Sequence, residues 1–333
     1  MASLLESLNG IFGADTIASL GKSLGADGSA VTKAIGAAGP LLLDGMAKMA
    51  STPSGADSLF NMAKEHGGGI LGSLGSMLGD VLSGGSAPTG PSGLLSSFLG
   101  SGANAIGASL SKTLGFNVGP LLAGTAPALL GLVSRVISAQ NLDASKLAAM
   151  LGKERDDFVA DPANKSAMEL VEAAREAGDK ADALIQSYGA DWAKVAAGPA
   201  AALFMVASAD PSGPIGSMKE VRAVSDKLLD IAKNAEPTSV LGAAFGNGMT
   251  ADMLRQLKSV APSKDDLLGA ISGAATAVSA KSPGEARAYK DAIYAVAEAA
   301  AKASKEGGFL GFGGTLVSKD EQAALDKLKA ALA

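Results

Sequence analysis

The sequence predicts an all-α protein made of two helical-bundle domains, the first with an internal duplication. Three observations support this fold class. Apolar residues recur every three to four positions in long stretches, which is the helical period. Ser282 with Glu285 and Ser318 with Glu321 fit the capping box, in which a hydroxyl residue is followed three positions later by Glu, and Ser263 is expected to begin another helix. No alternating run of β-branched residues of useful length is present, so strands are not expected.

The composition predicts cores of small side chains. Hydrophobic residues make up 47% of the 333 residues, whereas aromatic residues make up only 4%, and alanine and glycine are abundant. We therefore expect helices that pack through small residues and close backbones instead of large rings.

Charge density divides the chain into two parts. Residues 67–134 carry only Asp80 and Lys112, whereas the later sequence is charged and rich in alanine. We predict a Gly/Leu-rich helical domain at residues 1–151 and an Ala-rich helical domain at residues 152–333.

The first domain contains two related segments. The stretch ASLGKSLG at residues 18–25 returns as ASLSKTLG at 108–115, and AAGPLLLDGM at 37–46 returns as GTAPALLGLV at 124–133. Each copy predicts a short helix, a turn, and an apolar helix with proline near its start, where proline is tolerated. A duplication of this kind is typical of a pseudo-symmetric helical bundle.

A glycine-faced helix is predicted between the two copies, at residues 67–85. Its large apolar side chains share one stripe, and the opposite face presents Gly72, Gly75 and Gly79. A glycine inside a helix costs ~1 kcal/mol, so this face needs a compensating contact, such as the close approach of another helix. We predict an interaction face here, followed by a flexible linker or long loop at residues 83–93.

Four blocks of the first domain carry a family resemblance: LLESLNGIFG at residues 4–13, GPLLLDGMAK at 39–48, STPSGADSL at 51–59 and LDASKLAAML at 142–151. On these blocks the domain resembles the YidB-like family of uncharacterised bacterial proteins. That family looks all-helical and has no agreed biochemical activity, so the resemblance implies a fold class and no reaction.

Two segments of the second domain, residues 203–228 and 299–328, each run from an Ala-rich helix through a Gly-containing loop to Ser, a polar spacer and Glu. They resemble the tellurite-resistance TerB-like domains, whose helices are joined by Ala-Asp-Gly loops with a Glu a few residues on. Pro211 stands where that family has glycine, and the second loop lacks the aspartate.

Carboxylates of these two loops are the candidate metal ligands. They could bring oxygen atoms to a hard cation such as Ca²⁺, and the set consists of Asp210, Glu220, Glu306 and Glu321. The alternative is that the glutamates complete capping boxes at helix starts.

Phe309 and Phe312 stand among glycines in the second loop. Glycine allows such a loop to turn with positive φ. We predict that the two rings plug the end of the helical bundle. The functional alternative is a docking knob for a protein partner.

Motifs for catalysis and cofactors are incomplete. The chain has no cysteine and one histidine, which excludes thiolate chemistry and a triad around a second histidine. LGKSLG at 20–25 lacks a glycine of the phosphate loop, and no strand precedes the dinucleotide-like GNGMTA at 246–251. HGGG at 66–69 resembles an esterase oxyanion loop, but the sequence has no G-x-S-x-G nucleophile elbow. We expect no enzymatic activity and no cofactor.

Charge and hydropathy bear on the partners. The net charge is −5 and no basic tract is present, so nucleic acid is not an expected partner. The uncharged run 113–134 is long enough to span a bilayer. The corresponding segment of the first copy carries Asp44 and Lys48. These charges favour a buried helical hairpin over insertion into a membrane. No Lys or Arg precedes Lys22, so a secretory signal is not expected.

These observations predict a cytoplasmic, non-enzymatic structural or scaffolding protein that forms homo-oligomers through its helices. One alternative is a TerB-like stress-response module that binds a divalent metal or a protein partner. The other is a protein that associates with a membrane surface through residues 67–134.

Overall fold

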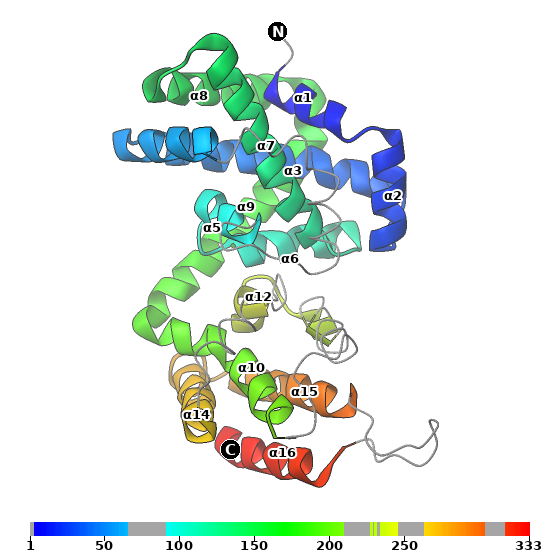
Figure 1. Ribbon diagram of the computed structural model, residues 1–333, viewed down its shortest axis with the longest axis vertical. Helices are drawn as coiled ribbons and strands as arrows, with labels where there is room; N and C mark the ends of the chain where they lie inside the picture. Colours follow the sequence, from blue (N-terminus) through cyan, green and yellow to red (C-terminus); the bar gives the residue numbers. More distant parts are fainter. Residues whose placement is uncertain are drawn as a thin grey trace. The chain divides into compact units, whose positions relative to one another are not determined.

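The computed structural model describes residues 3–65, 91–209, 227–228, 230–231, 234–245, 263–303 and 317–333. Every regular element in these ranges is a helix (Figure 1), so the all-α prediction is confirmed. The chain divides into two compact units, Met1–Lys180 and Ala181–Ala333. Each is described by itself.

The first unit is a bundle around two long helices. Its elements are α1 (Leu4–Ile11), α2 (Ala14–Leu24), α3 (Gly28–Met49), a helical segment at 53–65, α5 (Pro91–Leu99), α6 (Ala103–Leu114), α7 (Gly119–Gln140), α8 (Ala144–Ala160), the 3₁₀ turn η1 (Pro162–Asn164) and the beginning of α9 (Lys165–Tyr188). Helices α3 and α7 pack against each other, and α1, α5 and α6 contact both of them (Figure 1).

Polar side chains cap the N-termini of three of these helices. Ser3 and Glu6 form a capping box at α1. Asp27 accepts a hydrogen bond from the Ala30 amide at 2.8 Å at the start of α3, and Asp143 caps α8 in the same way. These caps satisfy amide groups that have no partner in the first helical turn.

The duplication extends over three helices in each copy, α1–α2–α3 and α5–α6–α7. Helices α3 and α7 are both 22 residues long. Helices α2 and α6 both end at a left-handed glycine, Gly25 with φ 65° and Gly115 with φ 80°. Glycine adopts this conformation without a Cβ penalty, which explains why the last residue of each ASL-x-K-x-LG stretch is kept.

Helices α1 and α5 are an additional matched pair that the sequence comparison missed. Leu4, Leu5 and Leu8 of α1 are buried, and the residues at the Gly25–Gly115 spacing in α5 are also buried apolar residues. These residues are Leu94, Leu95 and Phe98. The sequence signal is short, because at this spacing only the two consecutive leucines and one serine, Ser7 matched by Ser97, are identical in the two helices.

The prolines of the repeat correct one prediction. The sequence predicts apolar helices that begin close to Pro40 and Pro127, but both prolines lie inside their helices. Helix α3 begins at Gly28, because Asp27 caps it, and α7 begins at Gly119. Burial of both helices offsets the hydrogen bond that each proline removes.

Helix α7 is the core helix of this unit. In the described part of the chain it alone is long and apolar enough to cross a membrane, and 83% of its most apolar window is buried. The uncharged run at 113–134 thus lies largely inside the bundle, as the buried-hairpin interpretation expects.

The unit boundary differs from the predicted division between residues 151 and 152. Val171 and Ala174 of α9 are buried in the core of the first unit. Arg175 of the same helix forms an ion pair with Asp44 of α3, with a nitrogen–oxygen distance of 3.3 Å. Residues 152–180 therefore pack with the first unit, despite their charged, Ala-rich sequence.

The second unit contains the end of α9, η2 (Gly189–Asp191), α10 (Trp192–Ala207), α12 (Val240–Phe245), α14 (Lys264–Lys281), α15 (Ala286–Ala303) and α16 (Lys319–Leu332). Helix α10 packs against α14, α15 and α16. The core of this unit consists largely of alanine and aliphatic side chains. Tyr188 and Tyr289 are the largest fully buried side chains among its described residues. This composition agrees with the expectation of small-residue cores.

Candidate functional site

Most residues of the predicted sites lie outside the described residues. They are Gly72, Gly75 and Gly79 of the predicted glycine face, Phe309 and Phe312 of the aromatic loop, and the candidate ligands Asp210, Glu220 and Glu306. The structure describes one predicted site residue, Glu321.

Glu321 is part of a helix cap. Its Oε2 accepts a hydrogen bond from the Ser318 amide at 2.8 Å, and the Ser318 hydroxyl accepts one from the Glu321 amide at 3.2 Å. The side chain is 3% exposed. Among the described residues, no three His, Cys, Asp or Glu side chains gather in a way that could hold a metal ion. Ser318 and Glu321 thus form the capping box that the sequence predicts.

The second predicted capping box, Ser282 with Glu285, is wrong. Glu285 instead accepts a hydrogen bond from the Val240 amide, at 2.7 Å, at the first residue of α12. The Ser282 hydroxyl accepts one from Tyr188. The local pattern is the same as at Glu321, but groups far away in the sequence bind both side chains.

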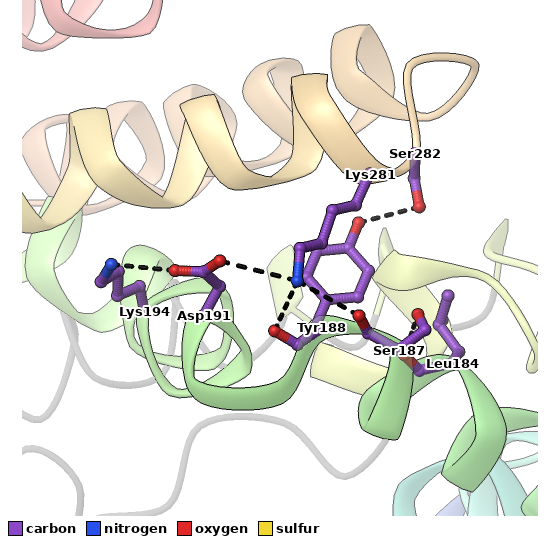
Figure 2. Close-up of polar contacts among 7 residues, drawn as sticks. All are labelled: Leu184, Ser187, Tyr188, Asp191, Lys194, Lys281 and Ser282. Carbon is purple, nitrogen blue, oxygen red and sulfur yellow. Dashed lines mark hydrogen bonds and ion pairs between the residues drawn. The ribbon is translucent and has the colours of Figure 1, made fainter.

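A polar network joins the end of α14 to the end of α9 (Figure 2). The Lys281 Nζ donates hydrogen bonds to the carbonyl oxygens of Ser187 and Tyr188, at 3.1 and 2.7 Å. It also lies 3.6 Å from Asp191 Oδ2, and Lys194 approaches the other oxygen of Asp191 at 2.9 Å. A cation is favourable at a helix C-terminus, where carbonyl groups lack partners. Lys281 therefore holds two helix ends together.

The two lysines affect the acidic group between them. The hydrogen bond from Lys194, followed by its charge, lowers the pKa of Asp191, and Lys281 adds to the effect. The Tyr188 hydroxyl donates a hydrogen bond to the Ser282 hydroxyl oxygen at 2.8 Å. Burial raises the pKa of this tyrosine. The groups of this network all have structural partners in Figure 2.

Tyr289 of α15 completes a hydrogen bond that α10 cannot make alone. Pro199 lies inside α10 and has no amide hydrogen for the Val195 carbonyl, four residues earlier. The Tyr289 hydroxyl donates to that carbonyl at 2.6 Å, and the tyrosine is fully buried. Gly198 makes room for it, since a Cβ there would lie 2.5 Å from the hydroxyl oxygen. Burial raises the pKa of Tyr289 further than that of Tyr188.

Glycines form close helix contacts in the first unit. A Cβ on Gly45 of α3 would collide with the backbone carbonyl of Phe98 in α5. A Cβ on Gly102, at the start of α6, would collide with the backbone of Gly178 in α9. Both contacts exist because two backbones approach more closely than any side chain allows.

An open groove of about 810 Å³ lies between α15 and the end of α16. Arg287, Lys290 and Lys329 line it together with one carboxylate, Asp291, and with apolar side chains. The Lys290 Nζ donates a hydrogen bond to a main-chain oxygen of Ala333, the last residue of the sequence, at 3.1 Å. The sequence does not reveal this cluster, because its cations come from two helices and form no continuous basic tract.

The first unit is thus an all-α bundle, rich in glycine and leucine, in which a three-helix segment occurs twice. Residues 6–136 match a family described as bacterial protein of unknown function (DUF937). The match begins in α1 and ends in α7, so it covers both copies of the repeat. It also lies inside the region that resembles an uncharacterised bacterial family.

No curated protein and no solved structure matches the chain. The comparisons give no support to the TerB-like resemblance of the second domain.

Proposed function

We propose that this chain is a non-enzymatic structural or scaffolding protein that acts through helix-mediated self-assembly. The observation that supports the proposal is the use of glycine in the first unit. Gly45 and Gly102 each lie where a second backbone occupies the position of a Cβ. The chain therefore uses glycines on helix surfaces as points of contact between helices.

The predicted helix at 67–85 carries the same residue type in greater number. Its face with Gly72, Gly75 and Gly79 needs a compensating contact, because each glycine disfavours the helix by ~1 kcal/mol relative to alanine. By analogy with Gly45 and Gly102, the proposed partner of this face is a helix of a second subunit.

Replacement of Gly75 and Gly79 by leucine tests the proposal. Leucine is the better helix former, but its bulk would block a close contact. We expect the wild type to be oligomeric in light scattering and the double variant to be a folded species of lower mass. Gly269→Leu is the matched control, because Gly269 is exposed in α14 and no atom approaches its Cβ position within 4 Å.

Three outcomes are distinguishable. A wild type that is monomeric at all concentrations rules out self-assembly. An oligomer whose mass survives both leucines places the subunit contact elsewhere. A double variant that melts lower, with the mass of a monomeric wild type, shows an internal contact.

The metal-binding alternative has less support. Glu321, the one described member of the predicted ligand set, already accepts a hydrogen bond from the Ser318 amide. A TerB-like role of this kind requires that added Ca²⁺ raise the melting temperature, because a ligand that binds only the folded state stabilises it.

A further inference from the structure

The groove between α15 and α16 differs in charge from the rest of the chain. Three cationic side chains and one acidic side chain line it together with Ala333, the last residue of the sequence, whereas the side chains of the whole chain have a net charge of −5. The local excess of positive charge is therefore not a consequence of a basic protein surface.

The cations come from both helices that border the groove. Arg287 and Lys290 are three residues apart in α15, a spacing that places them on the same helix face. Lys329 faces the groove from α16. Arg287 is 3.7 Å from Asp291, and both of these side chains are highly exposed. An ion pair this exposed is weak and leaves Arg287 available for another anion.

The lining also contains apolar surface. Pro283, Ala286, Tyr294 and Leu332 contribute to it. The Lys290 Nζ donates a hydrogen bond to a main-chain oxygen of Ala333, the last residue of the sequence, at 3.1 Å. An oxygen acceptor can thus lie in this groove against a lysine, beside apolar side chains.

We propose that this groove binds an acidic, amphipathic peptide segment of a protein partner. Carboxylates of the segment pair with Arg287, Lys290 and Lys329, and its apolar side chains cover the alanine, tyrosine and leucine surface. This is the helix-in-groove mode of recognition, in which the apolar face supplies affinity and the charges set orientation. The binding is separate from self-assembly.

A peptide fits the groove better than a small anion does. The three cations are distributed over two helices along an open surface, and a site for a free phosphate would enclose it with converging donors. The apolar lining would remain in water if only a small anion were bound.

Fluorescence anisotropy with the full chain tests the proposal. The probe is a fluorescein-labelled peptide of about twelve residues, with Glu and Leu at helical spacing. We expect the wild type to bind it and Lys290→Glu/Lys329→Glu to weaken binding by about tenfold or more, since attraction is replaced by repulsion. A probe with Lys in place of Glu, and one with Ser in place of Leu, should both bind weakly.

Lys302→Glu/Lys319→Glu is the matched control variant. It makes the same change in net charge on the same two helices, at side chains that do not line the groove. It should bind the probe as the wild type does. Circular dichroism melting establishes that both variants fold, and Lys290→Gln/Lys329→Gln replaces the reversal pair if that pair does not.

Every other result contradicts the proposal. Absence of wild-type binding, or equal weakening in both charge-reversal pairs, shows that the groove does not bind the peptide. Complete displacement by millimolar phosphate at constant ionic strength, with equal binding of the Ser-containing probe, shows a small-anion site. A wild-type oligomer that dissociates in Lys290→Glu/Lys329→Glu shows that a second copy of this chain occupies the groove.

Discussion

In the first unit, helices approach each other at glycines, whereas in the second unit a buried tyrosine fills the space between helices. Gly45 lies against the backbone of Phe98, and Gly102 lies against that of Gly178. Between α10 and α15, by contrast, the Tyr289 hydroxyl reaches the Val195 carbonyl at 2.6 Å. Contacts of the first kind need the absence of a side chain, and contacts of the second kind need its presence.

This difference determines which substitutions are harmful. An added methyl group should damage the first unit, because a packed backbone cannot move aside cheaply. A removed hydroxyl or ring should damage the second unit, because it leaves a polar group or a cavity. Matched substitutions in the two units therefore test whether the comparison holds.

The largest effect is expected at Tyr289. Tyr289→Ala should destabilise the second unit by about 3–5 kcal/mol, the usual cost of truncating a large buried aromatic residue. Tyr289→Phe keeps the ring but leaves the Val195 carbonyl without its donor, at a cost of about 1–3 kcal/mol. Trp192 is the only tryptophan of the chain and lies 5.5 Å from the Tyr188 ring. Its fluorescence during urea denaturation therefore measures both effects.

Pro199→Ala is the control for this interpretation. Alanine restores the amide hydrogen that the Val195 carbonyl lacks, so Tyr289→Phe should cost less in this background than in the wild type. A double-mutant cycle measures the coupling. Purely additive effects would show that the hydroxyl does not compensate for the proline.

A smaller effect is expected within α3. Gly45→Ala should destabilise the first unit by about 1–3 kcal/mol, because the new Cβ meets the Phe98 backbone. Gly36→Ala in the same helix should stabilise it by about 0.5–1 kcal/mol, because no atom lies within 4 Å of its Cβ position. Denaturation followed by far-UV circular dichroism gives both values, with Trp192 fluorescence as a reference for the second unit.

The sign of the Gly45 effect is decisive. If both alanines stabilise the first unit equally, its backbone contacts are soft and the contrast with the second unit disappears.

Local patterns in the sequence predicted local structure. The periodicity predicted helices, and Ser318 with Glu321 and Ser263 with Asp266 form capping boxes where helix starts were expected. In these cases both partners lie within four residues, so the sequence contains the whole interaction.

Interactions between distant residues were not predictable. Glu285 repeats the local pattern of Glu321 but caps α12, because the Val240 amide reaches it from another part of the chain. Arg175 pairs with Asp44 of α3, although the composition around Arg175 resembles that of the second unit. The groove cations come from two separate helices. Periodicity and composition carry no information about such pairings.

The smallest effect is expected at Asp191, where polar groups instead of packing join the helices (Figure 2). Hydrogen bonding to Lys194, and then the charge of that lysine, lowers the pKa of Asp191 in the folded chain. A carboxyl group with a lowered folded-state pKa stabilises the protein at neutral pH. This stabilisation is lost as the pH falls through that pKa, below the unfolded value of about 3.9.

Asp191→Asn should therefore be slightly less stable than the wild type at neutral pH, and the two should converge as the pH falls below about 4. The effect is small because the carboxylate is exposed and screened by water. Trp192 fluorescence in urea at several pH values measures it, and added salt at neutral pH should reduce the difference. A difference that persists in acid would mean that the asparagine disturbs the Lys281 contacts with Ser187 and Tyr188. Hydrogen-bond geometry, and not charge, would then hold the ends of α9 and α14 together.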